Sequence, residues 1–389
     1  MSMTKENFKF GLLFLCASHT LLHVYTNLPL ALLPILIDEY GLPILIASII
    51  ISIPRAFSLI LSVPSGLLAD RLGHTKLISF SLFLQVSAAT LIMLFPTIEI
   101  IVLCFSLTAL ASTFYHPPAL SATTNISPPH FLSRGLGFHG ASGTLGISLG
   151  PITLGLLLNW LEWRYAYLVW VAPIFVVAVI AFFVNIDEPS SEDYDGSKGR
   201  SLTTPLKDVL SITFLSLLLL MLFRSAAGSS ISTYLTTYLT EGKGLDASLA
   251  SIIFGLSPLI GLASVIIGGY AGDKLGWRKS LTSVILVATI ALFCMFISVS
   301  PIQTVMFYLV YGFFNIMTMP ITTSLVANIV PPKSRGTAYS LQFIPMSIIG
   351  IVMPVILGLL ISFLDLWIIF PVAIGFYIIV LAFTQVLKV

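Results

Sequence analysis

Charged side chains are scarce in this 389-residue chain, at 9% of all residues, whereas 57% of the residues are hydrophobic. A soluble protein of this length needs far more charge on its surface. The apolar residues form long blocks, and a block of about 20 residues crosses a hydrocarbon core roughly 30 Å thick. The short alternating segments of a transmembrane β-barrel are lacking. We therefore predict an all-α polytopic membrane protein, because lipid offers the backbone no hydrogen-bond partner.

Cysteine is also rare, and Cys16, Cys104 and Cys294 all lie inside apolar blocks. This placement favours neither a disulfide framework nor a metal site. The sequence has no nucleophile–base pair, no metal-ligand cluster and no phosphate-binding loop. These absences argue against a membrane enzyme and against direct use of ATP, and the lack of an added soluble domain argues against a sensor. We expect no enzymatic activity, no cofactor and no bound metal.

The apolar blocks predict twelve transmembrane helices in two groups of six. A polar stretch from Asn185 to Asp208, with mixed charge and with Pro, Gly and Ser, is typical of a solvated linker between the groups. We predict an N-terminal six-helix bundle over residues 1–186, a cytoplasmic linker over 187–207 and a C-terminal six-helix bundle over 208–389. The predicted spans lie near 10–37, 44–69, 77–95, 98–125, 135–159, 165–186, 208–240, 247–271, 280–299, 301–329, 336–361 and 365–387.

Basic residues are distributed unequally between the two sides of the membrane. If the N-terminus is cytoplasmic, fourteen of the 18 Lys and Arg residues fall on the cytoplasmic side. Only Arg164 and Lys243 fall outside, and Arg55 and Arg224 lie within spans. Cytoplasmic loops of membrane proteins carry an excess of basic residues. We therefore predict a multi-pass protein of the plasma membrane with both termini in the cytoplasm.

The sequence contains an internal repeat. The stretch "GLLADRLGHTK" at residues 66–76 recurs as "GYAGDKLGWRK" at 269–279, a shift of 203 positions. "PPHFLSRG" recurs as "PPKSRG", each ahead of a fifth span, and Pro151 and Pro354 are again 203 positions apart. Three matches in order indicate a duplication of six spans. Such parallel repeats place the substrate site between the two halves, near the bilayer midplane.

The repeated loop carries a family resemblance. It matches the pattern G-x-L-x-D-R-x-G, which resembles the signature of the major facilitator superfamily. The resemblance implies two six-helix bundles related by pseudo-two-fold symmetry, which rock around a central cavity, and it implies a gating role for the paired loops. Leu68 belongs to the matched pattern, and the residues of the predicted gating motif are Gly66, Asp70, Arg71 and Gly73 in the first copy and Asp273, Lys274 and Gly276 in the second.

The fifth span carries a finer resemblance. Its glycines and proline are similar to the antiporter signature G-x8-G-x3-G-P-x2-G-G of drug-exporting members, with Leu154 in place of one glycine. The stretch "FYHPPA" in the fourth span, followed by "SRGLGFHGASG", resembles fosmidomycin-resistance-type efflux proteins. The arginine that many drug–proton antiporters carry in the fourth span has no counterpart. The resemblance implies export, while glycines at these spacings also serve ordinary helix packing. The motif residues are Gly137, Gly146, Gly150, Pro151 and Gly155.

Ionisable residues inside the membrane are costly and mark functional sites. All 16 acidic residues fall at span ends or in loops. The deep groups are His19, His23, Arg55, His116 and Arg224, with His139 about one turn into its span. Without a buried acid, the two arginines favour an anion, because the planar guanidinium fork suits carboxylate, phosphate or phosphonate. Alternatively, each arginine binds backbone carbonyls or an acid across the bundle.

Polar residues recur at helical spacing on four spans, the first, fourth, seventh and tenth. In the resembled family these four helices line the cavity. The predicted stripes are His19, His23 and Asn27; Thr108, Ser112 and His116; Arg224, Gly228, Ser232 and Thr236; and Tyr308, Tyr311, Asn315 and Thr322. The substrate-binding candidates are Arg224, Arg55, His23, Asn27, His116, Tyr311 and Asn315.

The membrane histidines have three competing interpretations. Histidine titrates near neutral pH, so His19, His23 and His116 are candidates for proton coupling. Neutral histidines that are hydrogen-bonded between helices explain the same pattern. A histidine pair four residues apart also suits a metal ion, but no carboxylate or thiolate lies at that depth, so no metal is predicted.

These observations predict a secondary active transporter that moves a small organic solute, anionic or amphipathic, by alternating access. Proton-coupled efflux is favoured. The alternative is an anion exchanger or importer that uses Arg55 and Arg224 without proton coupling. The expected partners are a small-molecule substrate, protons and the lipid bilayer, with no nucleic acid, and the chain is expected to act as a monomer.

Overall fold

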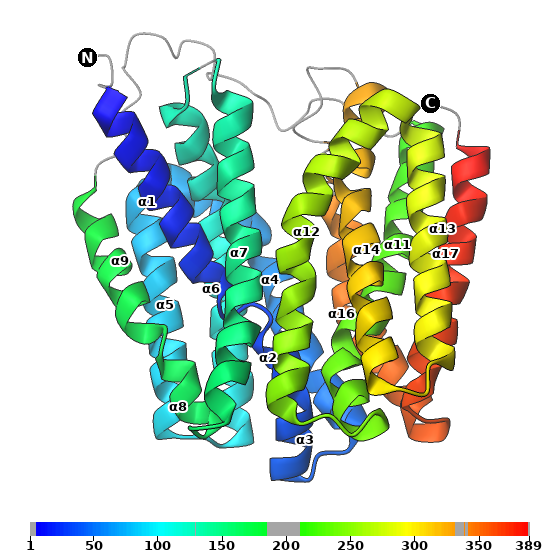
Figure 1. Ribbon diagram of the computed structural model, residues 1–389. Coiled ribbons are helices and arrows are strands. Elements are labelled where there is room, and N and C mark those ends of the chain that lie inside the picture. Colours follow the sequence, from blue (N-terminus) through cyan, green and yellow to red (C-terminus); the bar gives the residue numbers. More distant parts are fainter. Residues whose placement is uncertain (1–4, 129, 185–210, 331–337, 339–340, 388–389) are drawn as a thin grey trace. The chain divides into compact units, whose positions relative to one another are not determined.

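A computed structural model describes residues 5–128, 130–184, 211–330, 338 and 341–387, and in residues 5–7, 62–72, 133, 327 and 343 it describes the backbone alone. The predicted linker at 187–207 lies outside the described residues. Within these ranges the chain is helical and has no strand (Figure 1). Twelve helical segments of the described chain are long and apolar enough to cross a membrane, as predicted. The helices are α1 (Lys5–His23), α2 (Leu28–Ala31), α3 (Leu33–Tyr40), α4 (Ile44–Leu72), α5 (His74–Leu94), α6 (Ile98–Ile126), α7 (Leu132–Leu158), α8 (Trp163–Leu168), α9 (Val171–Phe183), α11 (Ile212–Thr237), a π-helix (Tyr238–Gly242), α12 (Ala247–Leu275), α13 (Trp277–Ile297), α14 (Pro301–Ile329), α16 (Phe343–Phe363), a 3-10 helix (Leu366–Ile368) and α17 (Ile369–Val386).

The helix bounds repeat with the period seen in the sequence. Helices α4, α5 and α6 begin and end 203 residues before α12, α13 and α14, respectively, at all six termini. The repeated loop therefore occupies the same structural position in both copies, between a second and a third span. The internal duplication predicted from sequence is confirmed at the level of secondary structure for these three pairs.

The repeated loop is a single glycine with an unusual backbone conformation in both copies. Gly73 has φ 88° and ψ 150°, and Gly276 has φ 80° and ψ 149°. Each glycine is the residue between two membrane helices and caps the second of them. Residues other than glycine almost never adopt this conformation, because a Cβ atom would clash with the backbone. The two loops therefore need glycine here for a physical reason.

Replacing either loop glycine should destabilise the fold. We expect Gly73→Ala and Gly276→Ala each to lower the free energy of unfolding by about 1–3 kcal/mol, the cost of such a backbone conformation for an L-residue. Thermal unfolding in detergent measures the effect. Gly269→Ala is a matched control, because Gly269 lies in helix α12 and an added Cβ would meet nothing within 4 Å. Equal stability of Gly276→Ala and Gly269→Ala would contradict the argument.

The first span is broken, which the sequence analysis did not predict. Helix α1 ends at His23, a turn follows, and α2 begins at Leu28 with Pro29 in its first turn. Proline has no backbone N–H and its ring clashes with the preceding turn, so the helix stops before it. Asn27 precedes α2 and makes no side-chain cap hydrogen bond. The prediction of one helical face across His19, His23 and Asn27 is therefore wrong at Asn27.

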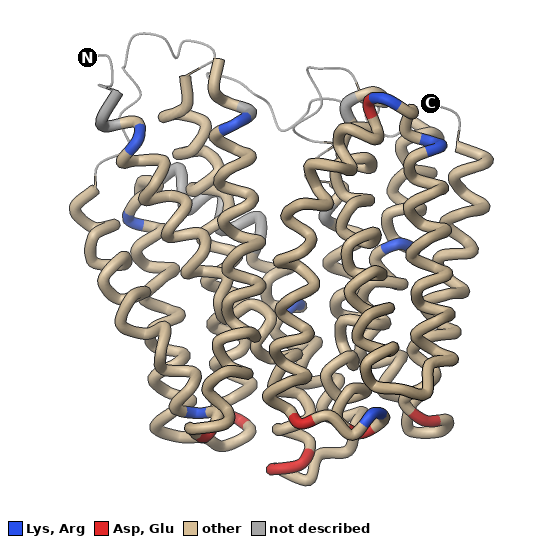
Figure 2. Tube along the Cα trace, in the orientation of Figure 1, with Lys and Arg blue, Asp and Glu red and all other residues tan. Residues whose placement is uncertain are grey.

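Contacts divide the chain into two compact units, each with its own core. The first unit contains α1, α2, α5–α9, residues of α4 from Ile53 onward and the start of α12 up to Gly255. In it α1 packs along α7, and α5 packs along α6 and α9. The second unit contains the remainder, where α11 packs on α16 and α17, and α13 packs on α14. Charged residues of the described chain lie mostly at helix ends in each unit (Figure 2).

Candidate functional site

Helix α1 lies very close to α7, because glycines of α7 leave room for it. An added Cβ at Gly143 would lie 2.5 Å from Cε1 of His19. At Gly146 it would collide with the carbonyl of Thr20, and at Gly150 with the carbonyl of Val24. Gly146 and Gly150 belong to the motif that resembles the antiporter signature. In the first unit, these two glycines allow the helix that carries His19 and His23 to pack closely against α7.

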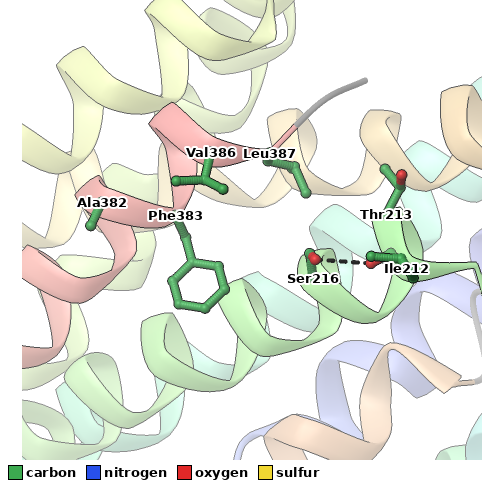
Figure 3. A pocket seen from close by; sticks show the side chains of 7 residues that line it. All are labelled: Ile212, Thr213, Ser216, Ala382, Phe383, Val386 and Leu387. Atoms are coloured by element: carbon green, nitrogen blue, oxygen red, sulfur yellow. Dashed lines mark hydrogen bonds between the residues drawn. The ribbon is translucent and has the colours of Figure 1, made fainter.

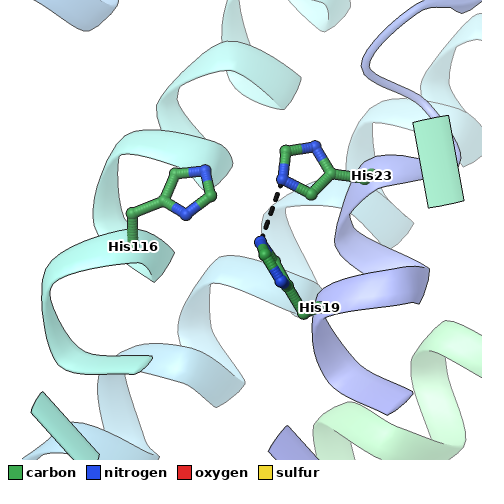
Figure 4. Close-up of side chains that lie close together, drawn as sticks. All are labelled: His19, His23 and His116. Atoms are coloured by element: carbon green, nitrogen blue, oxygen red, sulfur yellow. Dashed lines mark hydrogen bonds between the residues drawn. The ribbon is translucent and has the colours of Figure 1, made fainter. Parts of the chain in front are cut away.

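Three of the predicted histidines come together in the first unit. His19 and His23 lie on consecutive turns of α1, and His116 faces them from α6 (Figure 4). The Nε2 atoms of His19 and His23 are 3.1 Å apart. The ring centroid of His116 lies 5.3 Å from that of His19 and 5.2 Å from that of His23. His19 and His23 are buried, and His116 is partly buried.

A fourth histidine joins this group and was missed as a site residue. His139 of α7 is buried, and its ring stacks on that of His19 with centroids 4.0 Å apart. Neither ring nitrogen of His139 has a hydrogen-bond partner of normal geometry. Its backbone carbonyl accepts a hydrogen bond from Nδ1 of His19, at 2.6 Å. The sequence signal was its position four residues before Gly143, in the span that carries the glycine motif.

The hydrogen bonds of the histidine group form a chain with a fixed direction in the neutral state. A carbonyl oxygen can only accept, so Nδ1 of His19 carries the proton in its bond to His139. Nε2 of a neutral His19 must then accept from Nε2 of His23. Nδ1 of His23 in turn accepts from the Thr26 hydroxyl, at 2.9 Å. For His19 and His23, the structure is therefore consistent with the alternative interpretation, in which neutral histidines are hydrogen-bonded.

Arg224 lies near the middle of α11 and faces α14 in the second unit. Its Nη1 donates to Oγ1 of Thr318 at 3.1 Å, while its buried Nε has no hydrogen-bond partner. No described carboxylate pairs with it, and the groups that interact with its charge are the phenols of Tyr311 and Tyr377. A guanidinium with an unused donor and no counter-ion is suited to an anion.

Polar groups from α14 and α17 surround this arginine. The Tyr377 hydroxyl donates to Oδ1 of Asn315 at 2.8 Å and lies 3.4 Å from the Tyr311 hydroxyl. The Asn315 amide also approaches Gly228, one turn after Arg224, where an added Cβ would lie 3.9 Å from its nitrogen. The structure thus brings together three of the seven substrate-binding candidates, Arg224, Tyr311 and Asn315.

The other candidates lie elsewhere. His23 and His116 belong to the histidine group of the first unit, and Asn27 precedes α2. Arg55 lies in the part of α4 that belongs to the first unit, partly buried and with no described ion-pair partner. Arg55 and Arg224 are therefore in different units.

The gating motif is described in part. The backbone of Gly66, Leu68, Asp70 and Arg71 belongs to α4, and for this part of the helix the structure describes the backbone alone. In the second copy, Asp273 is exposed in the last turn of α12. The Lys274 ammonium donates to the Tyr270 hydroxyl at 3.1 Å. Gating by the paired loops stays a prediction.

A separate pocket of about 390 Å³ lies between the start of α11 and the end of α17 (Figure 3). Its lining is mostly apolar, and among the described residues that line it none is charged and none is a predicted site residue. In the described lining, the side-chain hydroxyls are those of Thr213 and Ser216, and Ser216 donates to the Ile212 carbonyl. The described lining therefore offers an anion no cationic group.

Comparison with known proteins gives consistent matches across the chain. A family model described as Major Facilitator Superfamily matches residues 13–354. The fosmidomycin resistance protein of Escherichia coli K12 is 26% identical over 285 residues, which cover 71% of this chain and 68% of that protein. The multidrug resistance protein MdtG of Salmonella schwarzengrund is 25% identical over 313 residues, 78% of this chain and 76% of that protein. A solved structure of a bacterial homolog to the human lysosomal transporter Spinster has a TM-score of 0.83 at 17% identity, covering 99% of this chain and 97% of that one.

Proposed function

Because this chain belongs to the major facilitator superfamily, we propose that this transporter exports a small organic anion in exchange for protons. The observation that carries the proposal is Arg224, a membrane-embedded guanidinium with an unpartnered Nε and no described carboxylate beside it. Removing a cation from water is costly unless an opposite charge compensates it. A bound anion supplies that charge, so the substrate completes the site.

The surroundings of Arg224 favour an organic rather than an inorganic anion. Two phenol rings, Tyr311 and Tyr377, and the Asn315 amide lie on the side that the guanidinium faces. Aromatic rings present apolar faces together with one polar atom each. The proposed substrate therefore has one anionic group for Arg224 and an apolar body that contacts the rings.

Export is favoured by the relatives and by the energetics of the membrane. Both relatives named above are resistance proteins by their descriptions. With both termini in the cytoplasm of an inside-negative cell, an anion that leaves and a proton that enters each move down the electrical gradient. Each charge gains about 2.3 kcal/mol per 100 mV. Exchange of the two is therefore doubly driven by the potential and needs no ATP.

The anion site is tested first by ligand-dependent thermal stabilisation. Benzenesulfonate and phenylphosphonate are suitable probes, and benzyltrimethylammonium is the matched cation with the same ring. We expect the two anions, and not the cation, to raise the unfolding temperature of the purified protein, since a ligand at 100 times its Kd stabilises by about 2.7 kcal/mol. Stabilisation by the cation alone would contradict the anion site.

Proton coupling is tested separately in proteoliposomes. Benzenesulfonate stays ionised at all working pH values, so it cannot cross the bilayer as a neutral acid. We expect its efflux to accelerate when the external medium is made acidic and to acidify the vesicle lumen, as read by a trapped pH dye. The efflux rate could instead be independent of the pH gradient and increase when an anion is present on the opposite side. This result would overturn proton coupling and favour the anion exchanger. Vesicles that contain the Arg224→Gln variant are the control.

A further inference from the structure

We propose that His19, His23 and His116 bind a divalent transition-metal ion of the Zn²⁺ or Ni²⁺ class. One ring nitrogen from each of the three residues lies within 4.8 Å of the other two (Figure 4). Two of the ligands come from consecutive turns of α1 and the third comes from α6. The proposal is independent of the anion site at Arg224, because it concerns different residues, and it assigns the three candidates for proton coupling to a metal site instead.

The spacing of the first two ligands suits a single ion. The Nε2 atoms of His19 and His23 are 3.1 Å apart. Two nitrogens bound to one Zn²⁺ at 2.0–2.1 Å in tetrahedral geometry are about 3.3 Å apart. The pair therefore needs to open by only a few tenths of an ångström. A modest movement of the His116 side chain completes a three-nitrogen face.

The outer nitrogens of both rings already have the partners that a metal-bound imidazole requires. Metal-ligating histidines almost always donate their other N–H to a carbonyl, carboxylate or water. Nδ1 of His19 donates to the His139 carbonyl at 2.6 Å, which leaves the Nε2 lone pair free. Nδ1 of His23 lies 2.9 Å from the Thr26 hydroxyl, which can accept as well as donate. Both Nε2 atoms are then available to the ion.

The first ligand is also held rigidly. The ring of His19 lies nearly parallel to those of His139 and Tyr115, with centroid distances of 4.0 and 5.5 Å and interplanar angles of 9° for both pairs. Gly143 lies against its edge, at a position where any Cβ would come within 2.9 Å of both ring nitrogens. A preorganised ring loses little entropy on binding, and this favours a real site over a chance grouping.

The donor set determines the class of metal. Imidazole suits Zn²⁺, Cu²⁺ and Ni²⁺, whereas Mg²⁺ and Ca²⁺ prefer oxygen ligands. No described carboxylate or thiolate belongs to the group. A fourth position therefore remains for water or a small anion. No metal was predicted from the sequence, because no carboxylate or thiolate lies at the depth of the His19–His23 pair. The third imidazole joins this pair only when α6 packs against α1.

Metal binding is tested on purified protein from which any polyhistidine tag has been removed. The probe is Co²⁺, followed by its visible d–d absorption and by equilibrium dialysis, with Zn²⁺ as competitor. We expect one Co²⁺ per chain, displaced by Zn²⁺. His19→Gln, His23→Gln and His116→Gln should each weaken binding by more than the roughly 10–100-fold cost of losing an outer-shell partner. His130→Gln is the control, because His130 is an exposed histidine, and this variant should bind Co²⁺ with the affinity of the unmodified protein.

If a histidine variant does not fold, a variant of Thr26, which positions the His23 ring, tests the metal site instead. Thr26 is exposed and contacts the ion only through His23, so Thr26→Val should preserve the fold and weaken Co²⁺ binding roughly 10–100-fold. Absence of Co²⁺ binding in the unmodified protein would overturn the proposal, as would full affinity in Thr26→Val or in any folded variant of the three ligands. Any of these results would leave the two interpretations predicted from sequence for the three histidines, proton coupling or neutral hydrogen-bonded side chains.

Discussion

Arg224→Gln is expected to abolish transport of an organic anion while the protein remains folded. The substitution removes the one cation near the middle of α11 and keeps a polar, though shorter, side chain. Truncating one partner of a hydrogen-bonded charge pair costs about 2–5 kcal/mol, which is roughly 30- to 5,000-fold in Kd. The same variant should lose the thermal stabilisation by benzenesulfonate. Transport in proteoliposomes and thermal unfolding in detergent measure the two effects.

Two further variants separate charge from geometry. Arg224→Lys keeps the charge and loses the planar fork, so we expect weakened but measurable binding. Arg134→Gln removes an exposed arginine near the start of α7 and should leave transport unchanged apart from any effect on membrane orientation. Near-normal transport by Arg224→Gln would remove this arginine from the substrate site and refute the proposed function.

Gly150→Ala is expected to be the most destabilising of the glycine substitutions in α7. A methyl group at this position would collide with the backbone carbonyl of Val24, which is less able to move than a side chain. Overpacking of this kind costs about 1–3 kcal/mol and occasionally more. Val24 directly follows His23, so the strain should also displace the histidine group and weaken Co²⁺ binding. Thermal unfolding and Co²⁺ titration measure these two consequences.

Gly137→Ala is the matched control, because it changes a glycine of the same helix and the same motif. An added Cβ at Gly137 meets nothing within 4 Å, and alanine has the higher helix propensity. We expect this variant to be as stable as the unmodified protein or slightly more stable. If Gly137→Ala and Gly150→Ala were equally stable, close packing of α1 on α7 would not be the reason for the motif.

The fold was predictable from sequence because its signals are local or periodic. The twelve spans follow from apolar length, and the repeated loop indicated both the duplication and the family, which the family match confirms. The break after His23 was missed although its cause, Pro29, is also local. Apolar residues on both sides of that proline gave one continuous hydrophobic block, and hydropathy does not register a turn inside such a block.

The sequence predicted which residues belong to the candidate site, but not which of them lie together in the structure. His19, His23, His116 and Arg224 were singled out because ionisable groups are rare within the membrane. The contact of His116 with α1 depends on how α6 packs, and the stacking of His139 depends on Gly143, which lies outside the recognised motif. Such tertiary contacts leave no periodic signal in one sequence. The prediction for Asn27 was wrong for the opposite reason. Its spacing from His23 is that of a helix, but the helix ends at His23.

The identical bounds of α4–α6 and α12–α14 permit a position-by-position comparison of the two copies. At the shift of 203, Pro117 corresponds to Pro320, but His116 corresponds to Met319 and Arg55 to Pro258. The two copies have therefore kept helix length and loop geometry, while the ionisable residues within the membrane diverged. The second copy preserves neither Arg55 nor His116 in these three helices, so the two halves differ in membrane-embedded ionisable residues on a common scaffold.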